Sequence, residues 1–294
     1  MKTWTMSCLV WSWLIAIVGC TREAPETAGL FFEAGAGALR EGRDLEAISK
    51  FGRAVEINPN HAEAHYGLGL AYKNTGAFDK AIVEMEKSLQ VGTHFERAHF
   101  APRAHYQLGT LYVLKGADEK AIQHWKEAAR LRPRLFGARN NLAITFYRLG
   151  RYEEAIEEWR ALLRTPGYAT PHVARSNLSA AYRASGRSEE ALTQAKIAVE
   201  VAKQLEVEYA GAYKNLGQAY VEEGQYEQAI EAYQEALAVE ASDSEVYYHL
   251  GVAYEALGNK AEALRAYRIY RDNAATSERD EEVNEAIQRL IREP

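Results

Sequence analysis

Glycine recurs along the chain at nearly constant intervals. Seven of these glycines are followed five residues later by alanine and then by isoleucine or leucine: Gly42, Gly76, Gly116, Gly150, Gly186, Gly224 and Gly258. The gaps between successive members are 34, 40, 34, 36, 38 and 34 residues. A period near 34 residues is typical of helical hairpins stacked in an array, because each hairpin buries its apolar stripe only against its neighbours. The sequence therefore predicts an all-α solenoid of about seven hairpins.

Each repeat also carries side chains whose size suggests where its helices meet. The repeated glycine is expected to end a first helix, because a left-handed backbone conformation costs glycine little and costs other residues about 1 kcal/mol or more. Seven residues earlier stands a small residue, which we expect to face the alanine of the second helix: Gly35, Gly69, Gly109, Ala143, Ser179, Gly217 and Gly251. Four residues before the turn, six repeats carry a ring that we expect to fill the space between hairpins: Tyr72, Tyr112, Phe146, Tyr182, Tyr220 and Tyr254.

These positions match a known repeat signature. Four repeats carry Leu-Gly in the first helix, at Leu68-Gly69, Leu108-Gly109, Leu216-Gly217 and Leu250-Gly251. Five carry an aromatic residue in the second helix, namely Phe51, Trp125, Trp159, Tyr233 and Tyr267, and Pro59 and Pro133 end two of these helices. The pattern resembles the tetratricopeptide repeat (TPR). This resemblance implies a right-handed superhelix whose first helices line a concave, ligand-binding side.

The repeats divide the chain into predicted segments. The seven hairpins are expected at residues 28–61, 62–95, 102–135, 136–169, 172–205, 210–243 and 244–277. Extra residues at 94–101, 170–171 and 206–209 are either longer loops or extensions of helices. The final segment, 278–294, carries Val283, Ile287 and Leu290 at helical spacing among charges. We expect it to be a capping helix, since an array must cover the apolar face of its last hairpin.

The N-terminal residues resemble an export signal. Lys2 precedes an apolar run from Leu9 to Gly19, which is too short to span a bilayer and fits the apolar region of a signal peptide at 1–19. The segment Ile17-Val18-Gly19-Cys20 resembles a bacterial lipobox, which implies a lipid on Cys20 and a tether at 20–27. The alternatives are an ordinary cleaved signal and an uncleaved anchor. By resemblance to bacterial lipoproteins, Thr21 after the cysteine implies the periplasmic side of the outer membrane rather than the inner membrane.

Composition and motifs argue against several other functions. The net charge of −6 disfavours nucleic-acid binding, and only Cys20 would remain after signal cleavage, so no disulfide can form within the mature chain. His61 and His65 lack the order of a zinc-protease motif, and phosphate-binding or nucleophile-elbow glycine motifs are missing. We therefore expect a non-catalytic protein without a cofactor or a metal.

A row of polar residues marks the predicted groove. Nine residues before the turn glycine, three consecutive repeats carry an asparagine, at Asn141, Asn177 and Asn215. An amide both donates and accepts hydrogen bonds, so this row could hold the backbone of an extended peptide. The complete candidate set is Asn140, Asn141, Tyr147, Arg148, Asn177, Arg183, Lys214 and Asn215. The competing interpretation is that asparagine belongs to the repeat consensus and that the cations are merely solvated.

Other repeats place tyrosine next to this position. Tyr66, Tyr106 and Tyr248 stand ten residues before their turn glycines, where they could recognise a protein or pack on adjacent hairpins.

The predicted function is therefore that of a scaffold. We expect a lipid-anchored periplasmic adaptor that binds a protein or extended peptide, as the resemblance to TPR lipoproteins in pilus, secretion and envelope assembly implies. Two alternatives stay open: a non-catalytic regulatory subunit of a cell-envelope hydrolase, and a self-assembling periplasmic binding protein.

Overall fold

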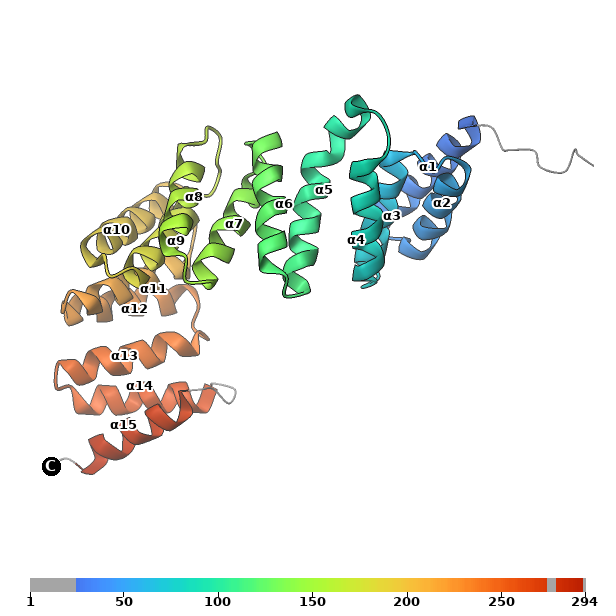
Figure 1. Ribbon diagram of the computed structural model, residues 1–294. Helices are drawn as coiled ribbons and strands as arrows, with labels where there is room; N and C mark the ends of the chain where they lie inside the picture. The colour runs from blue at the N-terminus through green and yellow to red at the C-terminus, as the bar shows by residue number, and fades with distance from the viewer. Residues whose placement is uncertain (1–24, 274–278, 293–294) are drawn as a thin grey trace, which may run out of the picture. The chain divides into compact units, whose positions relative to one another are not determined.

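The computed structural model describes residues 25–273 and 279–292, and these residues form helices joined by short connections (Figure 1). In the described part of the chain there are fifteen α-helices and no strand, which confirms the all-α prediction. Their bounds are Pro25–Arg40 (α1), Asp44–Ile57 (α2), Ala62–Asn74 (α3), Phe78–Gln90 (α4), His94–Leu114 (α5), Asp118–Leu131 (α6), Phe136–Arg148 (α7), Tyr152–Arg164 (α8), Pro171–Ala184 (α9), Ser188–Gln204 (α10), Ala210–Glu222 (α11), Tyr226–Val239 (α12), Ser244–Ala256 (α13), Lys260–Asn273 (α14) and Asp280–Arg292 (α15).

The helices pack in sequence within two compact units. Unit 1 is Met1–Leu131 and contains α1 to α6, whereas unit 2 is Arg132–Pro294 and contains α7 to α15. Each odd-numbered helix from α1 to α13 packs against the helix that follows it, which gives the hairpins. In unit 1, α1 also contacts α3, and α3 contacts α5. We call the surface formed by α1, α3 and α5 the first-helix face of unit 1.

The backbone at the turns confirms the role predicted for the repeated glycines. All seven have a positive φ, between 69° and 77°. At Gly186, for example, the backbone amide donates to the carbonyl of Arg183, and the next amide donates to that of Tyr182. This hydrogen bonding closes the first helix in the left-handed conformation that glycine adopts without strain.

At two of the small residues of the first helices, the nearest group is an aromatic ring of the second helix. A Cβ added at Gly109 would lie 2.5 Å from Nε1 of Trp125, and one added at Gly217 would lie 2.5 Å from Cε1 of Tyr233. These rings come four residues after the alanine that we expected to be opposite. At these two glycines the nearest group is therefore the ring and not the alanine, whereas at Gly69 the backbone oxygen of the predicted alanine, Ala81, lies 3.2 Å from an added Cβ.

The rings before the turns lie between consecutive hairpins, as predicted. The hydroxyl of Tyr112 on α5 donates to Oε1 of Glu86 on α4 at 2.5 Å. The guanidinium of Arg160 on α8 lies over the ring of Tyr182 on α9, 5.5 Å from its centroid. Each of these rings therefore contacts the second helix of the preceding hairpin. Apolar packing and cation–π attraction act together there.

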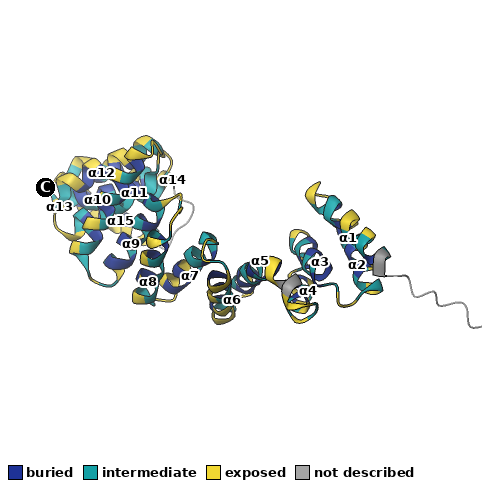
Figure 2. Cartoon of the chain, turned by 90° about the horizontal axis from the view of Figure 1, so that it is seen from above, coloured by how far each residue is buried: buried dark blue, intermediate teal, exposed yellow. Residues whose placement is uncertain are grey.

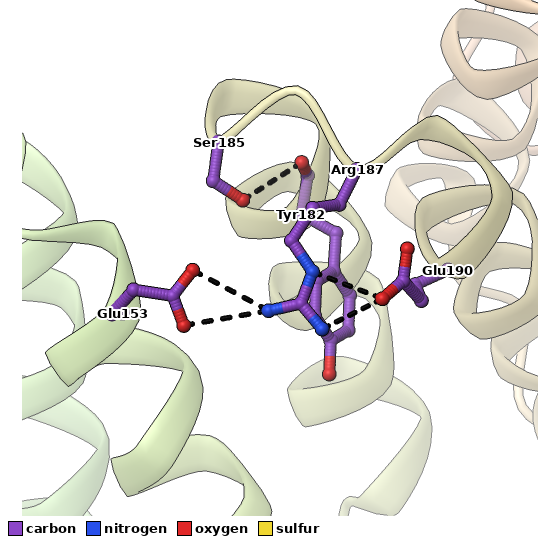
Figure 3. Close-up of polar contacts among 5 residues, drawn as sticks. All are labelled: Glu153, Tyr182, Ser185, Arg187 and Glu190. Carbon is purple, nitrogen blue, oxygen red and sulfur yellow. Dashed lines mark hydrogen bonds and ion pairs between the residues drawn. The ribbon is translucent and has the colours of Figure 1, made fainter.

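Charged residues at the turns also join neighbouring hairpins. Arg187 precedes α10, and its guanidinium donates to Glu190 at 2.6 Å and to Glu153 of the preceding hairpin at 3.4 Å (Figure 3). The same group lies 4.6 Å from the ring centroid of Tyr182. One arginine thus connects two hairpins near the surface.

Two of the extra segments have different structures. Residues 94–101 belong to the long helix α5, so here the helix-extension alternative holds. Residues 206–209 follow the end of α10 and form a loop, in which Glu206 has a φ of 54°. A left-handed conformation is strained for a residue with a side chain.

The last helix, α15, covers the final hairpin. Val283, Ile287 and Leu290 are buried in one cluster with Tyr267 and Tyr270 of α14. The opposite face of α15 is exposed and charged. Figure 2 shows the same division throughout the described helices, with buried residues between helices and exposed residues on the outer surfaces.

Candidate functional site

The predicted asparagine ladder lies on α7, α9 and α11 of unit 2, where all three side chains are partly exposed. Asn215 has a structural role, because its amide nitrogen donates to the backbone oxygen of Ser176 at 3.0 Å and to the Ser176 hydroxyl at 2.7 Å. Asn140 accepts a hydrogen bond from Nε1 of Trp159 at 3.1 Å. Among the described residues, the side chain of Asn177 has no hydrogen-bond partner. The asparagines of the ladder therefore differ in role, because Asn215 is hydrogen-bonded within the chain and the side chain of Asn177 is not.

The predicted cations of the groove are engaged within the chain. Nζ of Lys214 lies 2.7 Å from a carboxylate oxygen of Asp243, and Nε of Arg183 lies 2.8 Å from one of Glu222. Arg183 also donates to Gln218. These ion pairs connect neighbouring hairpins and reduce the positive charge that a ligand would meet.

The other predicted groove residues lie at the surface of α7. Tyr147 is 36% exposed, and its ring lies next to those of Tyr152 and Trp159, with centroids 5.6 and 6.3 Å away. Arg148 is exposed at the end of α7. Asn141 is partly exposed and lies seven residues earlier in the same helix. A ligand-binding role for this predicted set stays a prediction.

The first-helix face of unit 1 carries a pocket that the sequence did not single out. It has a volume of about 340 Å³, at the lower end of the range of about 300–1,000 Å³ that is usual for ligand pockets. The apolar lining comes from α1, α2, α3 and α5: Phe32, Ala36, Leu39, Phe51, Tyr66, Gly67, Leu70 and Phe100. The polar lining residues are Arg40, Glu63, His99 and Arg103.

The base of this pocket is fixed by tight packing around Phe51. This ring is only 1% exposed. Added Cβ atoms at Gly35 and Gly67 would come within 2.8 and 2.5 Å of it, so the ring lies against the backbones of both α1 and α3. Tyr66 stacks on Phe100 of α5 with centroids 5.4 Å apart. Aromatic contacts thus hold all three first helices around the cavity.

The charges around the pocket are mainly positive. Arg40 and Arg103 are exposed, and neither has an acidic partner in the described part of the chain, where Arg40 donates only to the backbone of Ala36. Among the lining residues that the structure describes, Glu63 is the single acid. Burial raises the pKa of Tyr66, and the positive charge of Arg103 opposes this rise. Tyr66 therefore stays neutral at physiological pH. Because Arg40 and Arg103 are exposed and have no acidic partner in the described part of the chain, an anionic ligand could contact both.

Two histidines of the first helices, His65 and His105, pair with side chains of the second helices of their hairpins. Nδ1 of His65 lies 2.6 Å from a carboxylate oxygen of Glu84, and its Nε2 lies 2.9 Å from the backbone oxygen of Pro59. Nδ1 of His105 lies 2.9 Å from Nδ1 of His124. Burial, and then the neighbouring His124, lower the pKa of His105 to about 4, so this pair is neutral at pH 7. Within residues 25–273 and 279–292, no three metal-binding side chains come together.

Of the tyrosines in two other repeats, Tyr248 packs on its neighbours. Tyr248 donates to Glu282 of α15 at 2.7 Å, and its ring lies 5.8 Å from that of Tyr270. Tyr106 accepts, through its backbone oxygen, the hydrogen bond from Nε1 of Trp125. Of the two roles that the sequence left open for these tyrosines, the contacts of Tyr248 favour packing.

Comparison with known families agrees with the repeat pattern. The family described as TPR repeat matches residues 39–76, 109–150 and 217–258. Families described as Tetratricopeptide repeat match 62–91, 140–204 and 245–277. The chain is a tetratricopeptide-repeat protein.

Curated relatives of this TPR chain include DnaJ homolog subfamily C member 3 from Rattus norvegicus and from Gallus gallus. The chain is 24% identical to the rat protein over 208 residues and 26% identical to the chicken protein over 212 residues, which is 71% of this chain in both cases. It spans only 35% of the length of each relative. The similarity is therefore confined to part of those proteins.

Solved structures of other TPR proteins have the same fold. The C-terminal part of a TPR repeat-containing protein from Cytophaga hutchinsonii superposes with a TM-score of 0.65, at 17% identity, covering 90% of this chain and 99% of that one. PilW, a type IV pilus biogenesis factor, superposes with a TM-score of 0.60, at 18% identity, covering 78% and 98%. At these identities the likeness concerns the fold.

The predicted signal at 1–19 and the predicted lipidation site Cys20 lie outside the described residues. Among the helices that are described, none is both long and apolar enough to cross a membrane.

Proposed function

We propose that this TPR protein is an adaptor that holds a protein partner on the first-helix face of unit 1. The observation that carries the proposal is the aromatic pocket, which combines an apolar lining with two arginines that have no acidic partner in the described chain. TPR proteins generally mediate protein–protein interaction, which supports this role.

We further propose that the adaptor acts in the bacterial cell envelope, anchored through a lipid on Cys20 to the periplasmic side of the outer membrane. Support comes from the apolar run that ends at Gly19-Cys20 and from the short segment between Cys20 and α1. The likeness to PilW, which is described as a pilus biogenesis factor, makes pilus or secretion assembly a suitable setting.

Affinity capture tests the adaptor role. Tagged wild-type protein and an Ala36→Glu variant would be purified from detergent-solubilised membranes, with Val83→Glu as the matched control. Ala36 lines the pocket, whereas Val83 is 47% exposed on α4. We expect a co-purifying protein to be lost with Ala36→Glu and kept with Val83→Glu. Retention in both variants, with helical content unchanged, would refute binding at this face.

The anchor is tested separately by Cys20→Ser. We expect this variant to move to the soluble fraction or to stall in processing. Normal processing together with full membrane retention would contradict lipidation, and would leave the adaptor proposal to be judged on the capture experiment.

A further inference from the structure

The pocket on the first-helix face of unit 1 is lined by aromatic residues that recur at the repeat period. Phe32, Tyr66 and Phe100 come from α1, α3 and α5 and are separated by 34 residues in each step. The aromatic stripe therefore follows the repeat period even where α5 begins early. Phe100 is 5% exposed, whereas Phe32 and Tyr66 are partly exposed. Part of the aromatic surface thus remains accessible to a ligand.

The size of the cavity limits what can enter it. A volume of about 340 Å³ suits one bulky side chain together with adjoining backbone, and it is small for a folded domain. Apolar and aromatic groups favour this site because burying them removes their surface from water. The occupant is therefore an extended segment that presents one large apolar side chain.

The charge of the rim specifies what flanks that side chain. On the corresponding first helices of unit 2, Lys214 and Arg183 are ion-paired with Asp243 and Glu222. Arg40 and Arg103 lack such partners among the described residues, and the described lining contains two arginines and one acid, Glu63. A guanidinium group binds a carboxylate through directed hydrogen bonds. The pocket is complementary to an anionic segment, although the protein as a whole is acidic.

We infer that the pocket receives an aromatic or branched apolar side chain from a separate partner protein, and that a carboxylate adjacent to it in the partner sequence contacts Arg40 and Arg103. This inference rests on the proposed adaptor function and names the chemistry of the segment that the adaptor recognises. Both the apolar side chain and the carboxylate then contribute to affinity, and the carboxylate also provides selectivity for an acidic segment.

Short synthetic peptides test this recognition directly. A fluorescein-labelled peptide Gly-Ser-Glu-Phe-Glu-Ser-Gly would be titrated with the full chain, and binding would be followed by fluorescence anisotropy. Two further peptides replace Phe by Ala, or both Glu by Gln. We expect each replacement to weaken binding at least fivefold. The effect of the Glu residues should shrink as ionic strength rises from about 0.01 M to about 0.15 M, because the screening length falls from about 30 Å to about 8 Å.

Charge reversal in the protein supplies the matched comparison. We expect Arg40→Glu/Arg103→Glu to bind the acidic peptide at least tenfold more weakly and to bind a peptide with Lys in place of Glu more tightly than wild type does. Arg268→Glu makes the same kind of change at an exposed position on α14 and should leave both affinities unchanged. The three replaced arginines are exposed, so the substitutions should not disturb folding. Circular dichroism would verify that the variants retain their helical content.

The results separate this inference from the adaptor function. Equal affinity for the Glu and Gln peptides, or equal affinity of wild type and the double variant, would overturn the assigned chemistry even if capture at Ala36 succeeds. Sedimentation equilibrium supplies a further check on the occupant. Self-association that is lost in the double variant would show that a second copy fills the pocket, and would overturn the assignment to a separate partner.

Discussion

Replacing Gly109 by alanine tests whether the rings fix the spacing of the hairpins. The added Cβ would lie 2.5 Å from Nε1 and 2.6 Å from Cδ1 of Trp125. Favourable contacts between heavy atoms lie near 3.5–4.0 Å, so the ring must move by about 1 Å. Trp125 is only 3% exposed, and it has little space into which to move.

The net effect follows from three contributions. Overpacking of a buried site costs about 1–3 kcal/mol. Moving the ring also weakens the hydrogen bond from Nε1 of Trp125 to the backbone oxygen of Tyr106, which is 3.1 Å long, and such a bond contributes about 1 kcal/mol. Alanine offsets up to about 1 kcal/mol through its higher helix propensity. We therefore expect Gly109→Ala to lower the free energy of unfolding by about 1–3 kcal/mol.

Gly52→Ala is the matched control. Gly52 lies within α2, and an added Cβ there would meet nothing within 4 Å. This variant should gain about 0.5–1 kcal/mol from propensity alone. Urea unfolding followed by far-ultraviolet circular dichroism would compare the midpoints. A Gly109→Ala protein as stable as Gly52→Ala would refute the packing argument.

Three other predictions concern single positions. Burial, and then nearby cations, lower the pKa of His249 from 6.5 to about 4. As pH falls, the unfolded chain therefore binds the proton first, and stability is lost between about pH 6.5 and about pH 4. His249→Gln should reduce this loss in urea midpoints measured against pH, and an unchanged pH dependence would contradict the prediction. Asn215→Ala should destabilise the protein by about 1–2 kcal/mol, because it removes both hydrogen bonds to Ser176. Asn177→Ala should change stability by less than about 0.5 kcal/mol. Equal effects in thermal unfolding would argue against a structural role for Asn215. Glu206→Gly should raise stability by up to about 1 kcal/mol because Glu206 has a φ of 54°, and a lower melting temperature would show that its side chain matters more than its backbone.

The fold could be predicted from the sequence because the same residue pattern occurs in every repeat, and each occurrence is independent evidence for a helical hairpin. A glycine at a positive φ is required at every turn, and the structure has one at each predicted position. The close approach of Trp125 to Gly109 was not predicted, because sequence spacing does not show how far a ring reaches across a hairpin. The ring of Trp125 lies directly against the backbone of Gly109.

The candidate site was harder to predict, since it depends on side chains from several helices. Treating residues 94–101 as extra separated Phe100 from the repeat register, although its distance from Tyr66 is one full period of 34 residues. Comparing aromatic positions at that fixed distance, independently of the turn glycines, would have found the stripe. The internal hydrogen bonds of Asn215 could not be foreseen, because they depend on the packing of α9 against α11.

Photocrosslinking in living cells tests the central claim most directly. Benzoylphenylalanine would be introduced in place of Ala36, which lines the pocket on α1, or in place of Val83, which is exposed on α4. The account predicts an adduct with one separate protein from position 36 and none from position 83. Adducts from position 83 with none from position 36 would contradict it, because the partner would then bind a different surface of unit 1.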